Sequence, residues 1–401
     1  MIPMITKRIQ NMTPSATEAH NTRVTELKAY GMDIIALNVG EPDFGTPDHI
    51  CRAACEALEQ QKTKYTAVSG IPALREAICE KLRADNGAVY TPAQISVGVG
   101  AKQPLLNAVL ALCEAGDEVI IPTPCWVSYI EMVKLADATP VLVPDREADG
   151  FALNLEGIRA AITPRTKAIM INTPNNPTGA VYTEAQLREL ADLACAHDFY
   201  IISDEVYEKL VYDGAKHVCA ASLSKEAWER TVVINGFSKA YAMTGWRLGY
   251  AAAPTKIIQG MNSLQSHMTS CTSSIAQYAG VEALRGPQEP LETMRRAFDA
   301  RRLFLLERLN EMDGVTCVNA SGAFYLLPNV SAYFGSTFEG KPIRDSFDLA
   351  EYLLDQAHVA VVPGAAFEAP ENLRIAYSNS MENLTRGMDQ MEAALAKLRR
   401  P

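Results

Sequence analysis

The sequence lacks the marks of a membrane or secreted protein. No segment approaches 18 uninterrupted apolar residues, the length needed for a membrane-spanning helix. The first ten residues place Lys7 and Arg8 after a few apolar residues, without a secretory apolar core or cleavage site. The nine cysteines are an odd number without a CxxC pair or zinc-type spacing, which argues against a disulfide framework or a structural metal. We therefore expect a protein of the reducing cytoplasm.

The sequence also lacks an excess of positive charge and the common phosphate-binding motifs. Its 37 Lys and Arg against 47 Asp and Glu give a net charge of -10, which disfavours nonspecific binding to nucleic acid or anionic membranes. No complete dinucleotide GxGxxG or Walker A motif is present in a strand-to-helix setting. The stretch GSTFEGKP from Gly335 has Pro342 where a magnesium-binding hydroxyl is required, so we expect a surface loop there. Any anion site must therefore be local.

What is present is a long chain of ordinary globular composition with an α/β pattern. Its 401 residues, 48% of them hydrophobic, exceed the size of one growing core and predict two domains. Short β-rich runs alternate with helical patterns, which predicts a mainly parallel seven-stranded sheet covered by helices. The runs are 95–100, 117–122, 139–143, 166–172, 199–204, 231–237 and 247–253. Near residue 290 the pattern changes to a long charged helix and short strands. We expect a large domain at 48–289 and a smaller α+β domain at 290–401, completed by an N-terminal arm at 1–47.

Polar side chains follow several of these predicted strands. Asp204 ends an apolar run, Asn176 lies in a turn after another, and Tyr207 follows Asp204 by three residues. A helix beginning near Ala101 would aim free N–H groups at an anion, which the guanidinium of Arg247 would also bind. Each residue alone has a structural alternative: a helix cap, a turn residue, a half-buried aromatic ring or a tight glycine turn.

Taken together, these strand ends fit one cofactor. The stretch NGFSKAYAMTGWRLGY adds Lys239 to the same sheet edge, eight residues before Arg247. Because ligands of parallel sheets gather at the carboxyl ends of the strands, an acid, an amide, a phenol, an amine and a guanidinium would surround one cleft. Pyridoxal phosphate uses each of these groups: a lysine for its aldehyde, a carboxylate for its ring nitrogen, and cations with N–H donors for its phosphate. A desolvated lysine near cations also has a lowered pKa, as imine formation requires.

The chain as a whole resembles the class I aminotransferases of pyridoxal-phosphate fold type I, and specifically the bacterial aspartate aminotransferase branch that includes prephenate-using members. The resemblance rests on an ordered set of motifs that spans nearly the whole chain. They are PSAT, LNVGEPDF, TKYTAVSGIPALREAI, GAKQ, WVSY, NTPNNPTGAVY, SDEVYE, SKAYAMTGWRLGY, SGAFY, VVPG and LRIAYSNS.

The resemblance implies roles around the cofactor ring. Lys239 would carry the imine and, once released, move the proton between the substrate Cα and the cofactor. Asp204 would pair with the ring nitrogen, and Tyr207 and Asn176 would contact the phenolic oxygen. Trp126 would stack on one face of the ring, for which the alternative is a core indole, and Val206 would pack on the other.

The resemblance also implies which residues bind the phosphate of the cofactor and the α-carboxylate of the substrate. The phosphate would be bound by the turn at Gly100, the N–H groups of Ala101 and Lys102, Ser238, Arg247, and Tyr65 from a second subunit. The protein would therefore work as a homodimer with shared active sites. Arg374, helped by Asn176 and the backbone at Gly40, would bind the substrate α-carboxylate.

Substrate choice is implied to depend on Lys102. In this branch the lysine, with the hydroxyls of Ser15 and Thr17, is implicated in binding a distal carboxylate, which favours aspartate, glutamate and their 2-oxo acids. The alternative is a solvated lysine in the first turn of a helix, where the helix dipole is unfavourable. Cys125 replaces an aromatic residue common in the branch and predicts a wider or differently polar pocket.

The expected reaction is a ping-pong transamination through lysine-bound pyridoxal phosphate, with oxaloacetate or 2-oxoglutarate as the oxo acid. Three alternatives stay open: a prephenate or aromatic aminotransferase, a carbon–sulfur β-lyase of the same fold type, and a noncatalytic cofactor-binding module. The acidic composition and the absence of an added DNA-binding region weigh against the last.

Overall fold

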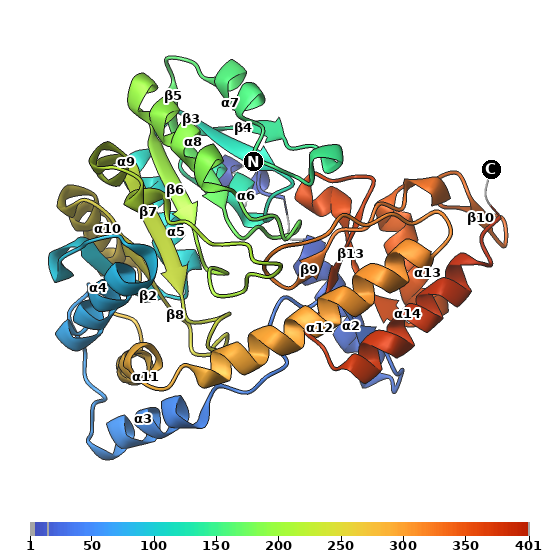
Figure 1. Cartoon of the computed structure of the whole chain (residues 1–401), viewed down its shortest axis with the longest axis horizontal. Helices are drawn as coiled ribbons and strands as arrows, with labels where there is room; N and C mark the ends of the chain where they lie inside the picture. Colours follow the sequence, from blue (N-terminus) through green and yellow to red (C-terminus); the bar gives the residue numbers. More distant parts are fainter. Residues whose placement is uncertain (1–4, 14–15, 400–401) are drawn as a thin grey trace.

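The computed structural model describes residues 5–13 and 16–399, and a seven-stranded sheet forms its centre (Figure 1). The strand order is β2-β8-β7-β6-β5-β3-β4, and β8 alone among these seven runs against its neighbours. The strands are β2 (Ile95–Val99), β3 (Glu118–Thr123), β4 (Thr139–Pro144), β5 (Thr166–Asn172), β6 (Tyr200–Asp204), β7 (Thr231–Gly236) and β8 (Leu248–Ala252). All seven predicted strands and the mainly parallel α/β sheet are confirmed.

The sheet is covered by helices because its strands are apolar on both sides. In β6, Ile201 and Ile202 are both fully buried but belong to different hydrophobic clusters, since successive strand residues point to opposite faces. The cluster around Ile202 includes residues of α5 (Lys102–Leu112), α6 (Ser128–Leu135) and α10 (Thr255–Met268). The cluster around Ile201 includes residues of α7 (Leu155–Ala161), α8 (Glu184–His197) and α9 (Lys225–Arg230). A third joins β2, β7 and β8 to α3 (Asp48–Glu59), α4 (Pro72–Asn86) and α11 (Ser274–Arg285). A capping box formed by Thr183 and Gln186 starts α8.

The C-terminal part packs beside this layered unit, with α12 (Glu289–Glu311) running between the two (Figure 1). Its small sheet has the antiparallel order β13-β14-β9, from β13 (Val362–Pro363), β14 (Leu373–Ala376) and β9 (Tyr325–Leu326). The helices α13 (Ser346–Ala357) and α14 (Met381–Leu395) pack against each other. From the N-terminal segment, β1 (Ile35–Ala36) pairs in parallel with β12 (Val359–Ala360). The domain limits at 47 and 289 remain a proposal.

The stretch from Gly335 lies mostly at the surface, as expected, and forms a short hairpin that the sequence did not indicate. In this hairpin β10 (Thr337–Phe338) is antiparallel to β11 (Lys341–Pro342). Glu339 and Gly340 between them have φ of 49° and 80°. Positive φ at both turn positions is the geometry of the two-residue turn that suits twisted strands. Among the described residues, no helix is both long and apolar enough to cross a membrane.

Candidate active site

A cavity of about 350 Å³ lies at the carboxyl ends of the parallel strands. Asp204 is the last residue of β6, and Lys239 follows the end of β7 by three residues. Arg247 comes immediately before β8, and because β8 runs antiparallel, its start lies at the edge where its neighbours end. Arg374 enters from β14 in the C-terminal part. All four side chains line the cavity, so the sheet topology brings together the residues that the sequence suggested.

The amine of Lys239 is in an apolar setting close to positive charge. Its Nζ donates to the carbonyl oxygen of Gly40 and lies 5.8 Å from the ring centre of Tyr207 and 5.6 Å from that of Phe324. Burial lowers the pKa of Lys239 to about 8 from the ordinary 10.5, and the positive charge of Arg374 adds to this effect. A substantial neutral fraction is therefore present near neutral pH.

Asp204 is a buried carboxylate with a hydrogen bond to each oxygen. The hydroxyl of Tyr129 donates to Oδ2 at 2.8 Å, and the N–H of Val206 donates to Oδ1 at 3.2 Å. Burial raises the pKa of Asp204 to about 6, while these two donors act in the opposite direction. A buried acid that faces a cavity in this way is suited to pair with a protonated ring nitrogen.

Arg374 is held by contacts that leave part of its guanidinium without a partner. Nη1 donates to Asn176 Oδ1 at 3.2 Å and Nη2 to the carbonyl of Asn38 at 2.7 Å. The guanidinium carbon lies 4.6 Å from the ring centre of Tyr325 and 4.8 Å from that of Phe367. Nε is buried and has no hydrogen-bond partner among the described residues. A buried cation with an unused donor fits the carboxylate of an amino acid.

The other end of the cavity offers donors for a phosphate. The helix α5 begins beside the cavity without a side-chain cap, so its first N–H groups face the space lined by Ala101 and Lys102. Ser238 and Arg247 line the same cavity. Gly100 has φ of 65°, and a Cβ there would lie 2.5 Å from Nη2 of Arg247, so only glycine lets the guanidinium lie against this turn. These donors fit the phosphate of pyridoxal phosphate.

Several other predicted residues also line the cavity: Gly40, Trp126, Asn176, Val206 and Tyr207. The hydroxyls of Tyr207 and Tyr325 are 2.9 Å apart, and the ammonium of Lys102 lies 4.8 Å from the ring centre of Trp126.

A few predicted residues are not part of the cavity wall. Tyr65 is 92% exposed in the single chain and does not line the cavity. Ser15 lies outside the described residues, and Thr17 belongs to α2 (Ala16–Ala29) with its side chain outside the described part. Cys125 is buried in the core and does not line the cavity, so the predicted change of pocket shape is not a direct contact of its thiol.

The sequence reading missed Tyr129, Tyr325 and Phe367 as parts of the site. Tyr129 is the second residue of α6, and its place in the sequence does not distinguish a tyrosine that binds an acid from one that packs in the core. Tyr325 and Phe367 come from the C-terminal part, and their approach to Arg374 depends on how the two parts pack.

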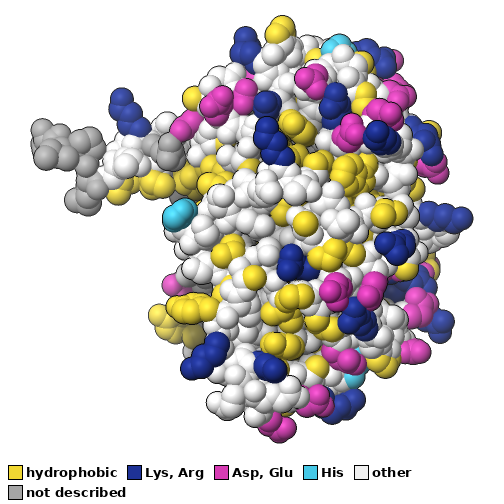
Figure 2. Space-filling view, turned by 90° about the vertical axis from the view of Figure 1, so that its left-hand side faces the viewer, with side chains coloured by type: hydrophobic (Ala, Val, Ile, Leu, Met, Phe, Trp, Pro, Cys, Tyr) yellow, Lys and Arg dark blue, Asp and Glu magenta, His cyan; other side chains and the backbone are white. Residues whose placement is uncertain are grey.

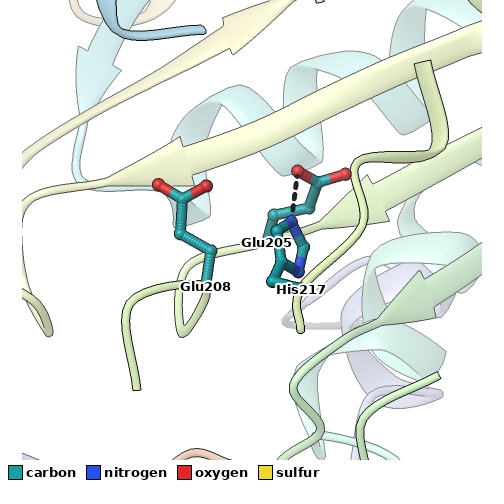
Figure 3. A group of neighbouring side chains, drawn as sticks. All are labelled: Glu205, Glu208 and His217. Atoms are coloured by element: carbon teal, nitrogen blue, oxygen red, sulfur yellow. Dashed lines mark hydrogen bonds and ion pairs between the residues drawn. The ribbon is translucent and has the colours of Figure 1, made fainter. Parts of the chain in front are cut away.

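A second group of charged side chains, Glu205, Glu208 and His217, begins one residue after Asp204 (Figure 3). The carboxylate of Glu205 pairs with Nε2 of His217 at 3.0 Å, and Glu208 lies beside them. Figure 3 shows the second ring nitrogen of His217 turned away from Glu208. The ammonium of Lys81 binds Glu208, and Asn86 donates to its other oxygen at 2.7 Å. This cluster therefore contains its own cation, and it satisfies buried carboxylates within the large sheet unit.

Comparison with known proteins defines the class. Residues 32–391 match the family of class I and II aminotransferases, so the chain belongs to that family, whose members use pyridoxal phosphate. The predicted fold type, and the assignment as a pyridoxal-phosphate-dependent aminotransferase acting between an amino acid and a 2-oxo acid, are confirmed.

Individual relatives agree over nearly the whole length. The chain is 49% identical to aspartate aminotransferase of Geobacillus stearothermophilus over 96% of this chain and 98% of that protein. It is also 49% identical to aspartate/prephenate aminotransferase of Cereibacter sphaeroides, over 97% and 98%. The solved aspartate aminotransferase of Thermus thermophilus with maleate has a TM-score of 0.92 and 45% identity, covering 98% of this chain and all of that one.

The setting of Lys239 predicts unusual reactivity in the cofactor-free protein. We expect the rate at which trinitrobenzenesulfonate modifies Lys239, followed by mass spectrometry of its peptide, to be half-maximal near pH 8. The neutral fraction at lower pH would then exceed that of an ordinary lysine by more than about a hundredfold. Arg374→Gln removes a nearby positive charge and should raise this midpoint. A midpoint near 10.5 in the parent protein would contradict the described setting.

Proposed function

We propose that this enzyme binds pyridoxal phosphate through Lys239 and transfers amino groups between aspartate or glutamate and the oxo acids oxaloacetate or 2-oxoglutarate. The observation that carries the proposal is the convergence of Lys239, Asp204 and Arg374 on one cavity, with an unused buried donor on Arg374. We also propose that it works in the cytoplasm, where its nine unpaired thiols would stay reduced.

The residues that line the cavity have different roles in the proposed transamination. When bound, the cofactor supplies an electron sink for the substrate α-carbon. Asp204 would hold a proton on the cofactor's ring nitrogen, and Tyr207 and Asn176 would contact its phenolic oxygen. Once released by the substrate, the neutral Nζ of Lys239 would accept the proton from the substrate α-carbon and donate it to C4′ of the cofactor, for which a pKa near 8 is suited.

Binding of the anionic groups falls to the arginines and the helix. Arg374 orients the α-carboxylate with its planar guanidinium, which fixes the bond that is to lose its proton. Ser238, Arg247 and the first turn of α5 hold the phosphate. The same cavity serves both half-reactions in turn, because both substrates carry an α-carboxylate.

A dicarboxylate preference is supported by Lys102. Lys102 lines the cavity with its ammonium over the ring of Trp126, and we propose that it binds the distal carboxylate with the hydroxyls of Ser15 and Thr17. The Thermus thermophilus relative, solved with maleate, binds a dicarboxylate. The relative from Cereibacter sphaeroides is named for prephenate as well, which keeps prephenate as a second candidate acceptor.

Lys102→Ala should weaken selection for dicarboxylates. We expect kcat/KM for aspartate to fall roughly 10- to 100-fold, the loss of one charged contact, with kcat/KM for alanine changed far less. Lys62→Ala is the matched control, because Lys62 also stacks on an aromatic ring, 5.9 Å from that of Tyr278, but does not line the cavity. Unchanged preference for aspartate in Lys102→Ala would remove Lys102 from the substrate pocket. A separate panel of oxaloacetate, 2-oxoglutarate and prephenate as amino acceptors, compared by kcat/KM, ranks the candidate oxo acids. Release of sulfide or pyruvate in the absence of any amino acceptor would identify a β-lyase instead.

We further propose that the enzyme is a homodimer in which Tyr65 completes the partner's phosphate site. Figure 2 shows the face that lies on the left of Figure 1, and hydrophobic side chains gather across its middle. Leu58 of α3, Tyr65 and Met268 of α10 are large hydrophobic side chains exposed by 47%, 92% and 52% in the single chain. Exposure of this kind favours a protein interface.

Subunit complementation tests the shared site. Lys239→Ala and Tyr65→Ala should each have low activity alone. After mixed refolding, half of the dimers are hybrids, and one of the two sites in each hybrid has both native residues, so about a quarter of the parent activity should return. Refolding each variant by itself is the control. Failure of the mixture to exceed the two separate variants would show that Tyr65 serves its own chain or none.

A further inference from the structure

Asp204 and Tyr129 form a buried pair at the edge of the cavity. Tyr129 is 1% exposed and Asp204 5%, and the phenol donates to Oδ2 at 2.8 Å. The other oxygen is held by the backbone of Val206, so the carboxylate has a donor on each side. In this buried environment a hydrogen bond to the ionised carboxylate of Asp204 is stronger than the same hydrogen bond would be in water.

The ring of Tyr129 has a second contact with the cavity wall. It meets the ring of Trp126 edge to face, with centres 5.5 Å apart and planes at 87°. Trp126 and Tyr129 both line the cavity; Tyr129 is the second residue of α6, and Trp126 lies in the segment just before that helix. One side chain thus supports both the acid and the aromatic ring that face the cofactor site.

We propose that Tyr129 is a positioning residue whose hydroxyl keeps Asp204 an ionised, correctly turned carboxylate, so that the proton shared with the cofactor's ring nitrogen stays on nitrogen. This inference rests on the proposed function. The physical reason is that Asp204 and the cofactor's ring nitrogen would share one proton. A hydrogen-bond donor to the carboxylate of Asp204 stabilises its charged form, and with it the state in which the proton is on nitrogen. The electron sink is strongest in that state.

Other charged or titratable groups near Asp204 do not replace this donor. Glu205 disfavours the charge of Asp204, and Lys239 favours it from across the cavity. Tyr207 donates to or accepts from Tyr325, and the thiol of Cys125 is buried with its pKa raised by that burial. The described residues therefore provide one side-chain donor to the carboxylate of Asp204, the phenol of Tyr129.

Tyr129→Phe in the enzyme reconstituted with pyridoxal phosphate tests the proposal. The change removes the hydroxyl and keeps the ring that supports Trp126. We expect kcat to fall roughly 10- to 100-fold, the effect of one hydrogen bond to a charged group, with little change in KM. The pH at which the Lys239-bound chromophore changes its visible absorption should rise by an amount on the order of one unit, because a less positive ring nitrogen repels the chromophore's proton less.

Tyr182→Phe is the matched control. Tyr182 is also a buried phenol, and it donates to Oδ2 of the buried Asp145 at 3.4 Å, but neither residue lines the cavity. Because Tyr182 does not contact the cavity, we expect Tyr182→Phe to leave the absorption midpoint unchanged. A second variant, Tyr129→3-fluorotyrosine, keeps the structure and makes the phenol a stronger donor, so its midpoint should fall.

The outcomes separate this inference from the proposed function. A parent enzyme without a visible chromophore or transamination would contradict the proposed function itself. A normal parent with an unchanged midpoint in Tyr129→Phe, or equal shifts in Tyr129→Phe and Tyr182→Phe, would overturn the positioning role. If Tyr129→Phe does not fold, an unchanged midpoint in Tyr129→3-fluorotyrosine overturns it, and a lowered midpoint supports it.

Discussion

The desolvation of one amine is the constraint on which the rest of this structure depends. Lys239 is half-buried beside the rings of Tyr207 and Phe324, and the nearby cation of Arg374 further disfavours its positive charge. A lysine in water is almost fully protonated at neutral pH and is a poor nucleophile. The burial that makes this amine usable also requires a carboxylate nearby, since several cations in one cavity need an anion. Asp204 and Glu41, which both line the cavity, supply negative charge within the protein, and the substrate and cofactor would supply the rest.

Sheet topology brings these charges together without long loops. The parallel strands end at one edge, and reversal of β8 returns the chain to the same edge, so Lys239 and Arg247 meet although eight residues separate them. Arg374 comes from a different sheet in the C-terminal part. The site therefore depends on how two packed units meet, and a relative movement of these units would change the distance between the arginine and the lysine.

Much of the fold and part of the site could be predicted from the sequence, for identifiable reasons. Strands buried on both faces leave long apolar runs, and polar residues after them mark the functional edge, which indicated Asp204 and Lys239. The role of Tyr129 could not be read in this way, because a tyrosine on a short helix has the same pattern whether it packs in the core or binds an acid. The partner-facing position of Tyr65 remains a proposal based on resemblance, since its exposure in one chain fits an interface but names no partner. The hairpin after Gly335 was missed because its turn uses Glu339 at a positive φ.

Reductive trapping tests the central claim most directly. The enzyme reconstituted with pyridoxal phosphate is treated with borohydride, digested and analysed by mass spectrometry, once alone and once after incubation with aspartate. We expect one pyridoxyl adduct, at Lys239, and its loss after aspartate has converted the cofactor to its amine form. An adduct at another lysine, or none at all, would contradict the assignment of Lys239 as the reactive amine.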